Sequence, residues 1–106
     1  MSDPLDRLRL DYRSALVGFL SVRGETQLAS AYELGRAAML GHVGLLELVQ
    51  LHNSVTLDLV RAAAGAAERL EIAEAAAAFL VEVLASSDMA RRGFLESARG
   101  SGDDPA

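Results

Sequence analysis

The stretch from Ile72 to Ala85 reads IAEAAAAFLVEVLA and decides the fold class. Alanine and leucine lead the scale of helix propensity, so this stretch predicts a helix. Glu74 and Glu82 interrupt the apolar run, which is too short to cross a bilayer, and we expect no membrane-spanning segment. The whole chain of 106 residues has the same character, because 51% of it is hydrophobic and only 5% is aromatic. Between Pro4 and Pro105 no proline bars a helix.

Apolar residues at helical spacing, separated by glycine breaks, divide the chain into four predicted helices. We expect these helices at about residues 4–20, 25–40, 44–64 and 66–98, with Gly41 in the left-handed conformation that often ends a helix. The last helix would be roughly 45–50 Å long and would outreach its neighbours. The predicted fold is therefore all-α, an antiparallel four-helix bundle with a long C-terminal helix. The bundle would comprise residues 1–99, and residues 100–106 would form a flexible tail.

The fourth predicted helix has two apolar stripes. We assign the stripe toward the bundle core to Ala73, Ala76, Ala77, Leu80, Leu84, Ser87 and Phe94. The second stripe lies to one side and consists of Ile72, Ala75, Phe79, Ser86 and Ala90. Leaving Phe79 and Ile72 in water would forgo several kcal/mol at about 25 cal/mol per Å², so the second stripe predicts a homodimer interface. The alternative is that Phe79 closes the bundle of its own chain.

A further face of the same helix is a candidate for binding a partner protein. Val81, Ala85, Asp88 and Arg92 follow one another at offsets of four, three and four, so they share one helix face. Together with Ala29 they predict a patch with a small apolar centre and a charged rim, which is the composition of a reversible interface. The competing interpretation is ordinary solvated surface.

Charge and composition exclude several classes of function. All ten basic residues are arginines, against fifteen acids, and the formal charge of -5 makes nucleic acid an unlikely partner. The absence of cysteine removes disulfides, thiolate metal sites and thiol catalysis. The amino terminus has no basic region followed by an apolar one, so we expect no signal peptide and a cytoplasmic protein.

Candidate catalytic and metal-binding residues are sparse. The two histidines, His42 and His52, lack the offset of three or four that adjacent ligands on a helix need, so we expect no metal. No turn of the Gly-x-Ser-x-Gly kind supports serine catalysis, and no glycine-rich loop follows a strand. We therefore expect neither an enzyme nor a cofactor. For His52 two interpretations remain: a buried ring satisfied by a carbonyl or carboxylate across the bundle, or a polar contact at a dimer or partner interface.

From Glu25 to Phe94 the chain resembles the amino-terminal domain of the RsbU family, which are bacterial regulatory phosphatases of stress-response partner-switching cascades. The matching segments are AYELGR at residues 31–36, LLELVQLH at 45–52, FLVE at 79–82 and MARRGF at 89–94. In that family the domain is a helical bundle that dimerises and receives an activating switch kinase called RsbT. A related bundle occurs in the circadian regulator KaiA.

The resemblance implies a non-catalytic regulatory module that binds proteins in a pathway controlling a sigma factor. Its expected partners are a second copy, an RsbT-like switch kinase or a full-length RsbU-type phosphatase. Family members usually carry the bundle ahead of a catalytic domain, whereas the helix here is expected to end at Gly100. Phosphatase activity is therefore not carried over, and action in trans is expected. The alternatives are a structural or assembly domain without a signalling partner, and a helical sensor of a small ligand.

Overall fold

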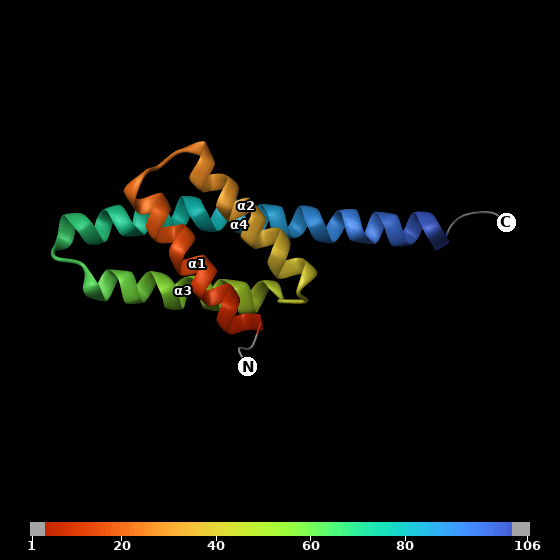
Figure 1. The fold of residues 1–106 in the computed structure, drawn as a ribbon, viewed down its shortest axis with the longest axis horizontal. Coiled ribbons are helices and arrows are strands. Elements are labelled where there is room, and N and C mark those ends of the chain that lie inside the picture. The colour runs from red at the N-terminus through yellow and green to blue at the C-terminus, as the bar shows by residue number, and fades with distance from the viewer. Residues whose placement is uncertain (1–3, 103–106) are drawn as a thin grey trace.

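The computed structural model describes residues 4–102, and this part of the chain is helical with no strand. The helices are α1 (Pro4–Ser21), α2 (Glu25–Leu40), α3 (Leu45–Ala62) and α4 (Ala66–Gly102). Figure 1 shows that α1 and α2 run in opposite directions, as do α3 and α4, and that the first pair crosses the second. The predicted all-α fold with four helices is confirmed. Three residues of the predicted tail, 100–102, belong to α4, and residues 103–106 lie outside the described residues.

The core forms where the two helix pairs cross. Tyr12 on α1 and Phe79 on α4 are both fully buried, and their ring centroids lie 5.3 Å apart in an edge-to-face arrangement. Phe19 adds a third ring at 5.9 Å from that of Phe79. Aliphatic side chains from all four helices surround these rings, among them Leu16, Leu34, Leu48, Val55 and Val83. Burial of a large aromatic side chain in such a cluster is a main source of stability.

Helices α2 and α4 approach each other closely at Gly35. Gly35 lies directly against the Ser86 hydroxyl and the Val83 carbonyl, so that no β-carbon fits at position 35. The Ser86 hydroxyl donates a hydrogen bond of 2.7 Å to the carbonyl oxygen of Tyr32. This bond satisfies a polar side chain that is only 2% exposed. A glycine, a serine and one hydrogen bond therefore set where α2 crosses α4.

The buried face of α4 differs from the predicted core stripe. Ile72, Ala75, Phe79 and Val83 are buried, whereas Ala73 and Ala77 are exposed and Phe94 is 61% exposed. The buried residues follow the spacing of a heptad, at offsets of three or four, and they point toward α1, α2 and α3. Phe94 remains exposed because it lies at the edge of the bundle, where none of these helices covers it. The assignment of Ala73, Ala77 and Phe94 to the core is therefore wrong.

The end of α2 also corrects an expectation. Gly41 has an ordinary φ of -86°, and His42 instead has the left-handed φ of 61°. The amide of His42 donates to the carbonyl of Met39, and the amide of Val43 donates to that of Ala38. This is the hydrogen-bond pattern of a Schellman motif, whose left-handed residue follows the last half-helical one. The helix ends at Leu40 as expected, but the left-handed residue that closes it is His42 and not Gly41.

The C-terminal part of α4 projects from the bundle. Beyond Asp88, no side chain from Met89 to Ala98 is buried. The helix has 37 residues, which corresponds to about 55 Å, in a molecule whose longest dimension is 64 Å. Figure 1 shows this segment extending past the ends of the other helices. The prediction that the fourth helix outreaches its neighbours is confirmed.

Candidate functional site

The predicted partner-binding patch lies on the surface. On α4, Val81 is 67% exposed, Ala85 and Arg92 are exposed, and Asp88 is half-buried. Asp88 Oδ2 accepts from Arg92 Nε at 2.9 Å, and its Oδ1 accepts from Arg91 at 3.1 Å. The carboxylate thus orients two guanidinium groups at the edge of the exposed apolar pair. Such a face can exclude water at its centre and orient a partner at its rim.

Ala29 lies apart from the four α4 residues of this patch. It is exposed on α2, where a shallow hollow separates it from Glu82 of α4. Leu28, Tyr32 and Glu25 complete the lining of this hollow. The residue of α4 that faces Ala29 across the hollow is therefore a glutamate rather than Val81. The patch is best defined by Val81, Ala85, Asp88 and Arg92.

The residues predicted to form a dimer interface lie mainly inside the chain's own core. Phe79 and Ala75 are 0% exposed, Ser86 is 2% exposed and Ile72 is 5% exposed, whereas Ala90 is half-buried. They are covered by α1, α2 and α3, so a second copy has no access to the first four in this structure. The alternative interpretation, that Phe79 closes its own bundle, agrees with this burial. In the sequence, Val83 and the heptad spacing of the buried residues could have indicated that Phe79 packs in the core of its own chain.

A buried polar pair joins α1 to α3. The Tyr12 hydroxyl is hydrogen-bonded to Nδ1 of His52, whose side chain is only 4% exposed. Nε2 of the same ring lies 3.4 Å from the Thr56 hydroxyl. Burial lowers the pKa of His52 and raises that of Tyr12, so both side chains are held neutral. The interpretation of His52 as a buried ring bonded across the bundle is confirmed, but its partner there is the Tyr12 hydroxyl and not a carbonyl or carboxylate.

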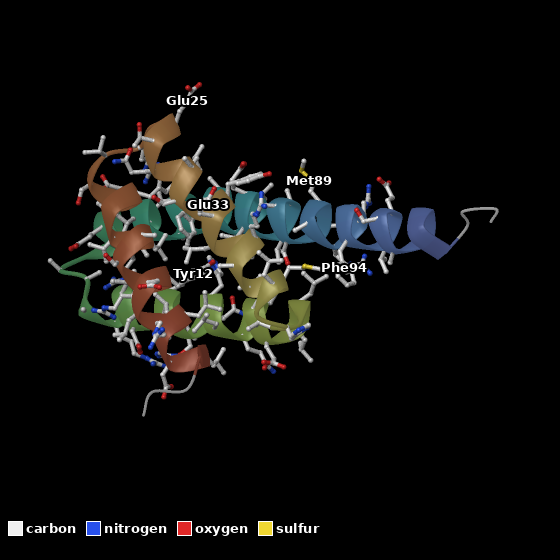
Figure 2. The ribbon with its side chains drawn as sticks, turned by 45° about the vertical axis from the view of Figure 1, so that its right-hand side comes forward. Tyr12, Glu25, Glu33, Met89 and Phe94 are labelled. Atoms are coloured by element: carbon white, nitrogen blue, oxygen red, sulfur yellow. The ribbon has the colours of Figure 1, made fainter. Side chains whose placement is uncertain are left out.

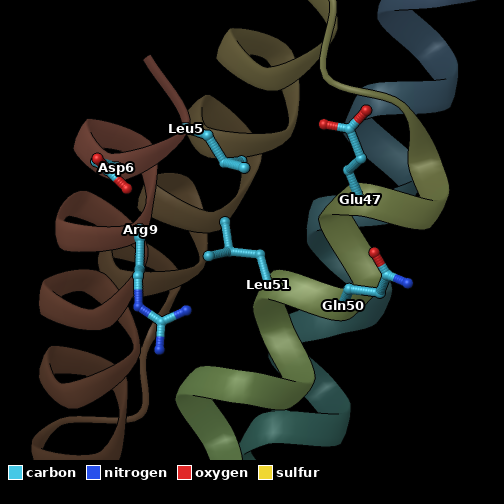
Figure 3. Close-up of a pocket in the computed structure, with 6 residues that line it drawn as sticks. All are labelled: Leu5, Asp6, Arg9, Glu47, Gln50 and Leu51. Atoms are coloured by element: carbon cyan, nitrogen blue, oxygen red, sulfur yellow. The ribbon is translucent and has the colours of Figure 1, made fainter. Parts of the chain in front are cut away.

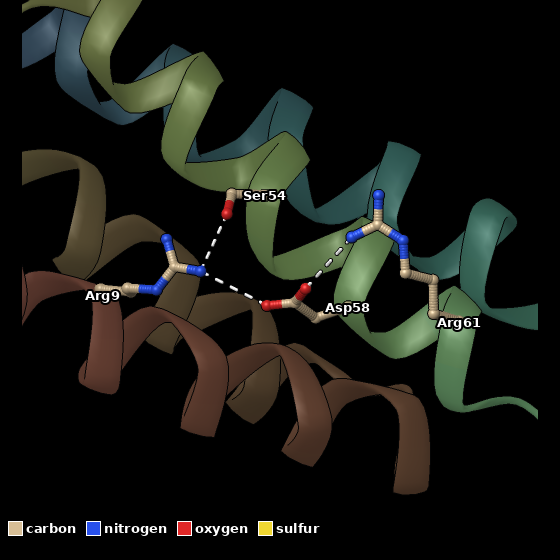
Figure 4. A network of polar contacts seen from close by, with 4 residues as sticks. All are labelled: Arg9, Ser54, Asp58 and Arg61. Carbon is tan, nitrogen blue, oxygen red and sulfur yellow. Dashed lines mark hydrogen bonds and ion pairs between the residues drawn. The ribbon is translucent and has the colours of Figure 1, made fainter.

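A second polar cluster fastens α1 to α3 at the surface. Arg9 donates to the Ser54 hydroxyl at 2.8 Å and to Asp58 at 3.3 Å, as Figure 4 shows. Asp58 also pairs with Arg61 at 3.5 Å. The Arg9 and Asp58 side chains are 43% and 44% exposed, so water screens the attraction. The cluster positions the outer edge of α1 and contributes little to the free energy of unfolding.

Next to this cluster is a small pocket between α1 and α3. Its volume is about 240 Å³, and it is lined by Leu5, Asp6, Arg9, Glu47, Gln50 and Leu51. Figure 3 shows Leu5 and Leu51 facing one another across it, with the charged groups spread around its margin. Ligand sites usually combine an apolar interior with a few convergent polar groups. Since these polar groups do not converge on one point, the pocket offers no evident catalytic chemistry.

The remaining features bear on metals and membranes. Within residues 4–102, no three His, Cys, Asp or Glu side chains lie close enough together to hold a metal ion. Over the same residues, no helix has the length and hydropathy to traverse a bilayer. The geometry therefore provides exposed helix faces and shallow grooves, and the described residues do not assemble a catalytic constellation.

These observations define the class as a small all-α helical bundle with exposed helix faces. The family model described as phosphoserine phosphatase RsbU, N-terminal domain, matches residues 10–90 of the chain. The match covers most of the 106 residues, so the chain belongs to the RsbU amino-terminal domain family. The resemblance seen in the sequence is thereby confirmed. Searches of curated proteins and of solved structures found no match.

Proposed function

We propose that this chain is a regulatory, non-catalytic protein-binding module of the RsbU family. The observation that carries the proposal is the family match over residues 10–90, which is the amino-terminal domain and not the phosphatase domain. Its partner would be an RsbT-like switch kinase in a cytoplasmic partner-switching pathway of the bacterial stress response that regulates a sigma factor. A full-length RsbU-type phosphatase is the other partner that this membership favours.

The face of α4 formed by Val81, Ala85, Asp88 and Arg92 supports the proposal. Its apolar centre is exposed, and its rim has a carboxylate already paired to two arginines. Burying Val81 would remove apolar surface from water, and the rim charges would set the orientation of the partner. A docking face of this kind requires no change in the fold of the module.

Titration calorimetry of the chain with an RsbT-like switch kinase tests the proposal. We expect Ala85→Asp to weaken binding by about 2–3 kcal/mol, because it would bury a carboxylate without a partner. Ala73→Asp is the matched control, since Ala73 is also exposed on α4 but lies more than three turns away. Absence of binding by the wild-type chain, or equal effects of the two variants, would contradict the proposed docking face.

Homodimerisation is part of the proposal, through a surface other than the buried stripe of α4. The described surface has large exposed apolar side chains outside that stripe, including Leu10 at 68% and Leu46 at 71%. Sedimentation equilibrium over a range of concentrations measures the association directly. A monomer at high micromolar concentration would remove the dimer from the proposal and leave binding of the kinase to be tested separately.

A further inference from the structure

The face of α4 that packs in the core continues past the bundle without a cover. Within the bundle Ile72, Ala76, Phe79, Val83 and Ser86 follow one another at offsets of four, three, four and three, and all five are buried. The same spacing continues through the small residues Ala90, Gly93 and Ser97. Beside this continuation Phe94 is 61% exposed. The projecting part of α4 therefore presents a helix-packing face that no described helix covers.

A groove follows this face along the junction of α2 and α4. Its volume is about 430 Å³, and its lining residues are Tyr32, Arg36, Leu40, Met89, Ala90, Gly93, Phe94 and Ser97. Three of them, Leu40, Met89 and Phe94, are large apolar residues between 58% and 61% exposed. Figure 2 shows Met89 and Phe94 on the projecting part of α4. Exposed apolar residues gathered in one groove are more informative than the same residues scattered singly.

The shape of the groove fits a helix. Gly93 has no atom within 4 Å of the position that a β-carbon would take, so the groove is open above this residue. Ala90, Gly93 and Ser97 are small and recur at offsets of three and four, which lets a second helix approach closely. Leu40 and Phe94 stand beside them as the apolar walls. An amphipathic helix docks into grooves of this form through apolar residues spaced by three and four.

The charge of the groove favours an acidic occupant. Arg36 is exposed in the lining and forms no ion pair within residues 5–98. Among the described residues, Arg36 is the one charged side chain that lines the groove. The charge in the lining is thus positive, although the chain has a net charge of -5. A second copy paired symmetrically would bring another Arg36 to the groove, and like charges oppose such pairing.

We propose that this groove binds an amphipathic helix of another protein, whose apolar face covers Leu40 and Phe94 and whose carboxylate pairs with Arg36. The inference rests on the proposed function in one respect, that the chain binds a protein partner. It adds a second surface, whose small residues Ala90, Gly93 and Ser97 lie on a different face of α4 from Val81 and Ala85. It also states the chemistry of the segment that docks there.

Fluorescence anisotropy with a synthetic probe tests the groove directly. The probe is a labelled helical peptide of about three heptads, with leucine at the core positions and glutamate beside them. We expect the full chain to bind this peptide at least about tenfold more tightly than a peptide with lysine in place of glutamate. Phe94→Ser should weaken binding of the acidic peptide at least about tenfold. Arg36→Gln should remove most of the preference for the acidic peptide.

Leu46→Ser is the matched control, because Leu46 is 71% exposed on α3 and does not line the groove. Since Phe94 and Arg36 are both exposed, circular dichroism should show unchanged folding for their variants. Equal weakening by Leu46→Ser, or equal affinity for the acidic and basic peptides, would overturn the proposal. Self-association of the wild-type chain that Phe94→Ser abolishes would also overturn it, since a second copy would then be the occupant.

The same variants separate this inference from the proposed function. One outcome is that a switch kinase binds and that Ala85→Asp weakens this binding, while Phe94→Ser and Arg36→Gln change neither the affinity for the kinase nor that for the peptide. In that case the groove proposal fails and the proposed function stands. The other outcome is that the acidic peptide binds as expected and no switch kinase binds. In that case the groove proposal stands, and the proposal that the partner is a switch kinase is wrong.

Discussion

His42 combines a left-handed backbone with a side chain that has a β-carbon. Its φ of 61° costs about 1 kcal/mol for a residue other than glycine, asparagine or aspartate. The surrounding Schellman hydrogen bonds hold it in this conformation nonetheless. We therefore expect His42→Gly to raise the free energy of unfolding by about 0.5–1 kcal/mol, measured by urea denaturation. His42→Ala keeps the β-carbon, so an equal gain from alanine would show that backbone strain is not the cause.

His52 should make stability depend on pH. Burial lowers its pKa from the ordinary value of 6.5, so the unfolded chain binds a proton first as the pH falls through that value. The contribution of His52 to stability is therefore complete above about pH 6.5 and decreases below it. We expect urea denaturation to show a loss of stability between about pH 7 and about pH 5 that is smaller in His52→Gln. Equal slopes in the wild-type chain and in His52→Gln would contradict the assignment.

Among the helices, α2 and α4 depend on one another through a single glycine. A β-carbon at position 35 would overlap the Ser86 hydroxyl and the Val83 carbonyl, and the carbonyl cannot move without the helix. We expect Gly35→Ala to lower the free energy of unfolding by about 2–3 kcal/mol. Gly18→Ala is the matched control, because Gly18 is also helical and has no atom within 4 Å of its β-carbon position. It should stabilise the protein by about 0.5–1 kcal/mol, and a similar loss in both variants would rule out overlap as the cause.

The two phenylalanines of α4 should respond oppositely to truncation. Phe79 is fully buried against Tyr12 and Phe19, whereas Phe94 is 61% exposed. We expect Phe79→Ala to cost about 3–5 kcal/mol and Phe79→Glu to unfold the protein instead of yielding a folded monomer. Phe94→Ala should change the free energy of unfolding by less than about 0.5 kcal/mol. Thermal melts by circular dichroism give both values, and a folded Phe79→Glu variant would show that the ring faces outward.

The sequence predicted the bounds of the helices better than it predicted which face of each helix is buried. Apolar periodicity and glycine breaks placed α2 at its observed bounds and the other helices to within a few residues. The orientation of α4 was harder, because alanines occupy several faces and the spacing fits more than one stripe. The contact of α4 with Gly35 of α2 determines which face of α4 is buried. The spacing of apolar residues along α4 does not reveal such a contact. The exposed Val81 and Ala85 were placed correctly because their face has few large apolar neighbours.

For the whole molecule, burial divides α4 into two parts of different stability. Over residues 66–98, where burial is described, the buried side chains of α4 all lie within residues 72–87, and none is buried from Met89 to Ala98. Local opening costs least where few apolar contacts are lost. We expect native-state hydrogen exchange to show protected amides in the first part and exchange at least about tenfold faster beyond Met89. Uniform protection along α4, in a chain shown to be monomeric at that concentration, would contradict the division.

The same long helix acts mechanically as a lever. It packs closely against Gly35 of α2 at Ser86, and about 24 Å of continuous helix separate that residue from Gly102. A tilt of about 10° about this fulcrum would displace Gly102 by about 4 Å, whereas atoms beside Ser86 would hardly move. A partner that alters the packing of α2 on α4 by less than the width of one atom would therefore produce a displacement at Gly102 large enough for a neighbouring protein to detect.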